Sequence, residues 1–89
     1  MNQSFSKVAE LWKHEKRQYV KISSYSIYVH LLNKHILPVF GHGGAPEEHS
    51  VQGFANRMLS ENYSIKTVKD ALLVIKMIVR YGEKLGKRL

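Results

Sequence analysis

Hydrophobic residues recur at helical spacing in four stretches of the chain, and short polar or glycine-containing breaks separate these stretches. In chain order, the four apolar faces are Phe5, Val8, Ala9, Trp12 and Tyr19; Tyr28, Leu31, Leu32, His35 and Ile36; Val51, Phe54, Ala55, Met58 and Leu59; and Val68, Ala71, Leu72, Ile75, Ile78 and Val79. The sequence contains no strand-like alternation and no internal repeat. The pattern therefore predicts an all-α protein in which four helices pack around one core.

Serines and a proline set the expected ends of the first two helices. We expect Ser4 to cap a first helix over residues 5–18, because its hydroxyl can accept a hydrogen bond from an early backbone N–H. Ser23 or Ser24 is expected to cap the second helix in the same way. Pro38 is expected to end that helix, because the residue before a proline is pushed out of helical geometry.

A glycine-rich segment at residues 41–46 predicts the loop between the second and third helices. Pro46 suits the first turn of the third helix, and the two glutamates that follow it would face the positive end of the helix dipole. Ser64 is expected to cap the fourth and longest helix, over residues 65–84.

Composition narrows the range of functions. The 89-residue chain fits one domain, and its 14 Lys and Arg against 7 Asp and Glu give a net charge of +7. Such an excess favours a polyanionic partner, nucleic acid before an acidic membrane. The absence of cysteine excludes a disulfide scaffold, a thiolate metal site and a cysteine nucleophile. No apolar run approaches the roughly 18 residues of a membrane span, and the N-terminus does not resemble a signal peptide. We therefore expect a soluble, cytoplasmic protein with no membrane partner.

Basic residues of the fourth helix gather on one side. At about 100° per residue they fall within an arc of about 80°, across the helix from most of its apolar face. This basic stripe consists of Lys66, Lys69, Lys76, Arg80, Lys84 and Lys87. An ordinary solvated face is one interpretation of the stripe, and a polyanion-binding surface is the other.

The start of the fourth helix favours binding. Lys66 and Lys69 lie in its first turns, where the dipole is positive and a cation is disfavoured by about 0.3–1 kcal/mol. No acidic capping box compensates, because Thr67 and not Glu stands three residues after Ser64. Together with free backbone N–H groups, Ser64, Lys66 and Thr67 would cradle a phosphate.

The start of the second helix repeats this arrangement, with a lysine, two serine hydroxyls and a tyrosine expected at the phosphate-facing end. Two such helix starts suit the backbone of a DNA duplex better than a small ligand. The predicted DNA-binding residues are Lys21, Ser23, Ser24, Tyr25, Ser64, Lys66, Thr67, Lys69 and Lys76.

No group of residues predicts a metal site, a cofactor or catalysis. The five histidines include no i, i+4 pair with a nearby acid of the kind that zinc-binding helices carry, and His35 is expected at the edge of the core. The glycines of the 41–46 loop lack the lysine and hydroxyl residue of a phosphate-binding P-loop. No nucleophile, base and orienting group occur in a recognisable pattern. The chain by itself is therefore not expected to be an enzyme.

Two segments resemble the N-terminal SAM-like, core-binding domain of tyrosine recombinases, the phage integrase family. They are Lys-x-Ser-Ser-Tyr at residues 21–25 and His-Ile-x-Pro-x-Phe-Gly at residues 35–41. Residues 59–82 look like the closing helices of that domain, so the resemblance extends over about residues 4–84.

The resemblance implies a four-helix SAM-like bundle that grips one face of a double-stranded DNA core site. In that family a separate C-terminal domain carries an Arg, a Lys, a His-x-x-Arg motif and the tyrosine nucleophile, none of which has a counterpart here. The resemblance therefore implies a domain at residues 1–84, an interdomain linker from residues 85–89, and a catalytic domain of about 150–200 residues beyond it. The implied partners are DNA, that catalytic domain and other recombinase protomers, in a bacterial or phage-encoded, nucleoid-associated protein.

Two other functions stay open. SAM-like folds also serve as helical protein–protein interaction modules. A stand-alone dimeric regulator of duplex DNA would need a helix-turn-helix, for which the break between the third and fourth helices is a loose match. DNA binding should collapse with salt, whereas an apolar protein interface should not.

Overall fold

The computed structural model of the chain describes residues 4–43 and 46–88. All regular structure in these residues is helical, and the elements are α1 (Phe5–Lys16), α2 (Ile22–Leu31), the π-helical turn η1 (Leu32–Ile36), α3 (Leu37–Phe40), α4 (Glu48–Ser60) and α5 (Ile65–Arg88). Because α2, η1 and α3 follow one another without a break, they form one rod. The described chain thus consists of four helical units in one domain, which confirms the predicted all-α fold.

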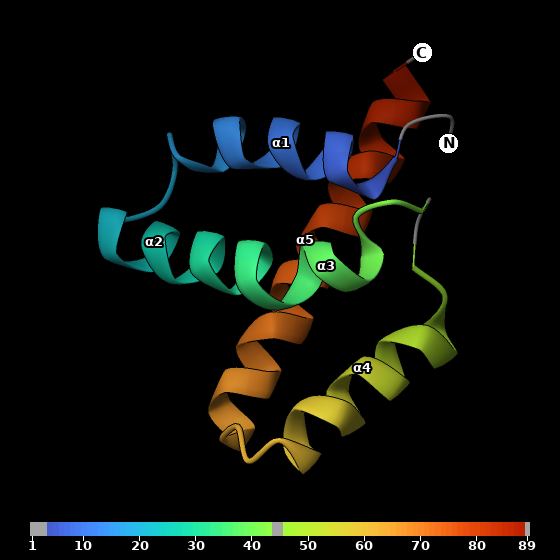
Figure 1. The fold of residues 1–89 in the computed structure, drawn as a ribbon. Helices are drawn as coiled ribbons and strands as arrows, with labels where there is room; N and C mark the ends of the chain where they lie inside the picture. Colours follow the sequence, from blue (N-terminus) through green and yellow to red (C-terminus); the bar gives the residue numbers. More distant parts are fainter. Residues whose placement is uncertain (1–3, 44–45, 89) are drawn as a thin grey trace.

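The helices form two layers: α1 and α2 lie in one, and the long α5 crosses them in the other. Figure 1 shows α1 and α2 side by side and antiparallel, with α5 crossing behind them and α4 meeting α5 at its start. The Cα atoms extend over 41 × 30 × 16 Å, and the shortest dimension fits two layers of helices whose axes lie about 8–10 Å apart. Helix α5 contacts α1, α2, η1 and α4, so it is the element that holds the others together.

One hydrophobic core connects all the helices. The Phe40 ring of α3 lies between Phe5 of α1, at 6.3 Å between ring centroids, and Phe54 of α4, at 5.4 Å. Trp12 is only 4% exposed and packs beside Tyr28, with ring centroids 6.4 Å apart. Most residues of the four predicted apolar faces are therefore buried, as expected.

The expected apolar faces are wrong at Tyr19, Leu59 and Val74. Tyr19 is 75% exposed, because α1 ends at Lys16 and the chain then turns out of helical phase. Leu59 lies at the side of α4 and is 46% exposed. Val74, which was not assigned to the apolar face of α5, is fully buried, because α5 is covered on more than one side and its buried arc is wide.

Serine caps are confirmed at two helices and wrong at a third. The Ser4 hydroxyl accepts a hydrogen bond from the Lys7 backbone N–H at 3.3 Å, and α1 therefore begins as expected. At α2 the N-cap is Lys21, whose side chain makes no capping hydrogen bond. Ser23 and Ser24 are the second and third residues of the helix, where their hydroxyls cannot cap it.

Pro38 does not end the second helix, contrary to the expectation. The backbone N–H of Leu37 donates to the Leu32 carbonyl, five residues back, which is the hydrogen bond of a π-helix. This wider turn accommodates the proline, which has no N–H to donate and which would clash with the preceding turn of a regular α-helix. The helix then continues through α3 and carries Phe40 into the core.

The later helix ends also shift slightly. Pro46 precedes the N-cap residue Glu47 of α4, so it lies just outside that helix and not in its first turn. Helix α5 passes through the buried Gly82 and reaches Arg88, four residues beyond the expected end.

Candidate nucleic-acid interface

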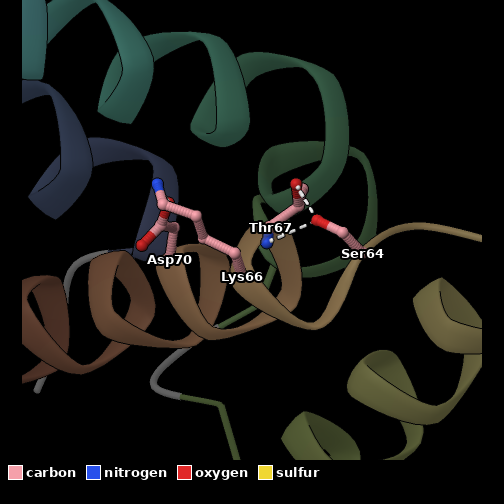
Figure 2. A network of polar contacts seen from close by, with 4 residues as sticks. All are labelled: Ser64, Lys66, Thr67 and Asp70. Atoms are coloured by element: carbon pink, nitrogen blue, oxygen red, sulfur yellow. Dashed lines mark hydrogen bonds and ion pairs between the residues drawn. The ribbon is translucent and has the colours of Figure 1, made fainter.

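The first turn of α5 is organised by its own hydroxyl groups. The Ser64 Oγ accepts a hydrogen bond from the Thr67 backbone N–H at 3.2 Å, which confirms Ser64 as the cap of this helix. The same Oγ lies 2.9 Å from the Thr67 Oγ1, and the two hydroxyls share a hydrogen bond (Figure 2). Both hydroxyls are thus held at the positive end of the helix dipole, where an anion is favoured.

Lys66 has an acidic neighbour that the capping pattern did not predict. Its Nζ lies 3.4 Å from Oδ2 of Asp70, one turn further along α5 (Figure 2). This pair offsets part of the repulsion between the lysine and the helix dipole. However, the Lys66 side chain is 86% exposed, and such surface pairs contribute at most about 1 kcal/mol. Lys66 can therefore exchange Asp70 for a phosphate at little cost.

The remaining basic stripe faces solvent. Lys69, Lys76, Arg80 and Lys84 are all exposed, and none of them forms an ion pair with another described residue. Leu73, which is 44% exposed, lies among them. The side chain of Lys87 lies outside the described residues. The stripe thus presents several cations, without an ion-pair partner among the described residues, along one side of α5.

The predicted residues at the start of α2 do not form one surface. Lys21 and Ser23 are exposed, whereas Ser24 and Tyr25 are half-buried. At about 100° per residue, Ser24 and Tyr25 point away from the side of α2 that carries Ser23. Figure 1 also shows α2 starting beside the end of α1, while α5 starts beside the end of α4.

The middle of α2, not its start, borders the first turns of α5. A groove of about 430 Å³ separates the two helices. It is lined by Ser26, Ile27, His30, Leu31, Lys34, His35, Tyr63, Thr67 and Asp70. Sequence reasoning missed Ser26, His30 and Lys34, although they follow Ser23 at helical spacing and form a polar face of the rod.

His35 forms part of the floor of this groove. Its ring meets the edge of Tyr63 in a T-shaped contact with centroids 4.8 Å apart, and its position at the edge of the core confirms the expectation. Burial lowers the pKa of His35 below its usual value, and the nearby positive charges of Lys34 and His30 lower it further.

The side chains at the start of α5 and along the groove between α2 and α5 include hydroxyls, lysines and imidazoles, which are groups that bind anions. Among the described residues, no group of three or more His, Asp or Glu side chains lies close enough together to hold a metal ion. No helix in the described ranges is long and apolar enough to cross a membrane.

The comparisons with known proteins point to one family. The family model described as "Phage integrase, N-terminal SAM-like domain" matches residues 4–42, which comprise α1, α2, η1 and α3. No curated protein and no solved structure matches the chain significantly. The matched segment contains both motifs on which the sequence resemblance rested, and it leads directly into the helices that complete the bundle. The resemblance is therefore confirmed over residues 4–42, which match the N-terminal, SAM-like domain of phage integrases, in a chain whose described residues are all-α.

Proposed function

We propose that this chain is the core-binding domain of a tyrosine recombinase and grips one face of a double-stranded DNA core site. The observation that carries the proposal is the exposed basic stripe of α5, on a domain whose residues 4–42 match the phage integrase model. In this proposal the catalytic domain of the same protein cleaves the DNA, and other protomers bind the neighbouring half-site.

The stripe has dimensions that suit a duplex. Lys66 and Arg80 are 14 residues apart, so their backbones lie about 21 Å apart along the helix at about 1.5 Å per residue. Because duplex DNA carries one phosphate per about 1.7 Å of its axis, a stripe of this length can meet several phosphates. Release of the condensed counterions would then provide most of the affinity.

The proposed contacts include residues at both helix starts, which lie apart from each other in the fold. On α5 they are the stripe lysines Lys66, Lys69 and Lys76, with the hydroxyls of Ser64 and Thr67 at the positive end of the helix dipole. On α2 they are Lys21, Ser23, Ser24 and Tyr25, of which the first two are exposed and the last two half-buried. We expect the α5 lysines to contribute more of the binding energy, because they are exposed and lie along one line.

A salt titration with a fluorescently labelled duplex tests the proposal. We expect weak binding with little sequence preference, because the other half of the recombinase clamp is absent. If about five phosphates are contacted, log K should fall against log salt with a slope of about −4.5. Lys66→Ala, Lys69→Ala and Lys76→Ala should each flatten this slope by about one unit.

Lys7→Ala is the matched control. Lys7 is an exposed residue of α1 on the side away from the core, and its substitution removes the same charge. If it flattens the slope as much as the α5 variants do, the stripe is an ordinary solvated face and the proposed interface is wrong.

A second candidate, a helical protein-interaction module, is favoured by a groove of about 450 Å³ between α4 and α5. Val51, Ala55, Leu72, Ile75 and Val79 form its apolar part. A partner held in this groove should stay bound at a salt concentration that releases DNA, because apolar contacts are not screened.

A further inference from the structure

A third concave surface lies toward the C-terminal end of α5, where that helix passes the C-terminal end of α1. It is an open cleft of about 400 Å³, within the usual size of small-molecule sites. Its lining residues are Trp12, Glu15, Lys16, Tyr19, Met77, Arg80, Tyr81 and Lys84. Arg80 and Lys84 also belong to the basic stripe of the proposed duplex surface, whereas the other lining residues lie outside that stripe.

The cleft has a positive rim. Three of its lining residues are cationic, Lys16, Arg80 and Lys84, and one is a carboxylate, Glu15. No ion pair joins any of the three cations to another described residue. Three cations around one concave space attract a ligand that carries at least one negative charge, because the low-dielectric walls of a cleft strengthen the local field.

The cleft also has an aromatic side and an apolar floor. Tyr19 follows α1 in a turn and is 75% exposed, so most of its ring is open to solvent. Trp12, which is 4% exposed, and the half-buried Met77 form a floor continuous with the core. An exposed tyrosine beside an apolar floor suits a flat aromatic ring, because aromatic rings stack on one another in offset geometry.

From these features we infer that the cleft binds one unpaired nucleotide. Its phosphate lies against Lys16, Arg80 and Lys84, and its base stacks on Tyr19. Bases inside a duplex are already stacked and paired, whereas a single strand or a free nucleotide exposes the base. This site therefore differs in ligand from the proposed duplex surface, although the two share Arg80 and Lys84 of the basic stripe.

Trp12 allows a direct test, because it is the only tryptophan of the chain and lines the cleft. The protein is titrated with a single-stranded oligothymidylate of about six nucleotides, with thymidine monophosphate, and with inorganic phosphate. Intrinsic fluorescence reports the cleft, and the anisotropy of a labelled oligonucleotide reports binding. We expect saturable binding of the oligonucleotide and the nucleotide, with a change in tryptophan fluorescence, at concentrations where inorganic phosphate has no effect.

Variants separate the stacking contact from general charge attraction. Tyr19→Ala should weaken oligonucleotide binding by roughly 5- to 150-fold, the range found for base–aromatic stacking, whereas Tyr19→Phe keeps the ring and should bind as the parent does. Lys16→Ala should also weaken binding, and Lys7→Ala serves as its charge-matched control. Because Tyr19 is exposed, Tyr19→Ala should fold normally, which circular dichroism verifies.

The outcomes also distinguish this proposal from duplex binding. Tyr19→Ala should leave the salt slope for duplex DNA unchanged, and Lys69→Ala should leave oligonucleotide binding unchanged. The nucleotide site is overturned if Tyr19→Ala binds the oligonucleotide as tightly as the parent. It is also overturned if inorganic phosphate produces the same fluorescence change at the same concentration, since the cleft would then be a general anion site.

Discussion

Gly41 occupies a buried position where the backbone of α3 and the start of α1 meet. A Cβ atom placed there would lie 2.6 Å from the Leu37 carbonyl oxygen, closer than real Cβ contacts allow. The Gly41 carbonyl accepts a hydrogen bond from Ser6 N–H at 3.3 Å, and that of Gly43 accepts one from Phe5 N–H at 2.8 Å. These carbonyls complete the capping of α1, so the glycine at the end of the second family-like motif has a structural role.

We predict that Gly41→Ala destabilises the domain by about 1–3 kcal/mol, because the methyl group forces the backbone to shift. Urea denaturation followed by circular dichroism measures the change. Gly53→Ala is the matched control, since Gly53 lies in α4 and a Cβ atom added there would meet no atom within 4 Å. That substitution should stabilise the protein by about 0.5–1 kcal/mol, the usual gain in a helix interior. Equal effects of both variants would show that Gly41 is not sterically required.

His35 makes the stability depend on pH. Its pKa is lowered in the folded protein, chiefly by burial, so the unfolded chain binds a proton more readily than the folded one. The stabilisation is therefore complete above the ordinary histidine pKa of 6.5 and is lost as the pH falls below it.

We predict that the free energy of unfolding decreases between about pH 7 and pH 5, and that His35→Gln makes this decrease smaller. Urea denaturation at a series of pH values measures it. The control is His42→Gln, at an exposed histidine, which should keep the slope of the parent. If His35→Gln follows the parent curve, then the surroundings of His35 do not shift its titration.

At the scale of elements, the connection between α4 and α5 depends on a single left-handed residue. Asn62 has a φ of 69°, and the N–H groups of Asn62 and Tyr63 donate to the carbonyls of Leu59 and Met58. This is the Schellman arrangement that closes a helix with a residue in the left-handed conformation, where asparagine is tolerated better than most residues. The turn sets the direction in which α5 begins, and thus the position of the Ser64 cap.

We predict that Asn62→Ala destabilises the domain by about 1–2 kcal/mol, whereas Asn62→Gly leaves it unchanged or slightly more stable. Thermal melts of the two variants measure the difference. A similar melting temperature for both would contradict the assigned conformation of Asn62.

Periodicity predicted the helices and most of their buried faces, but it did not predict where each helix ends or how neighbouring helices pack. Four helical units follow from the spacing of Phe5, Leu32, Phe54 and Ile75 with their neighbours. The continuation past Pro38 could not be predicted, because it depends on a π-helical turn that no local signal marks. The groove beside His30 arises from packing between α2 and α5, which sequence spacing alone does not contain.

At the scale of the whole molecule, the two proposed sites share the later turns of α5 but differ at the start of that helix. The first turns of that helix carry the hydroxyls and Lys66, and its later turns carry Arg80 and Lys84. Because all the other helical units pack on α5 through one core, neither site has a separate folding unit to support it. A substitution deep in this core should therefore unfold the whole domain at once.

Trp12→Ala tests this single-core architecture. Trp12 is 4% exposed and packs beside Tyr28 within the common core, so its truncation should cost about 3–5 kcal/mol. For a domain of this size that cost lowers the melting temperature by at least about 12 °C, and it approaches the whole stability of a small protein. Melting followed by circular dichroism should show one transition, shifted as a whole. Tyr19→Ala, at the exposed tyrosine, is the matched aromatic control and should melt within a few degrees of the parent. Loss of α1 in a separate early transition, with the remaining helices melting at the parent temperature, would show instead that α1 docks onto an independently stable bundle.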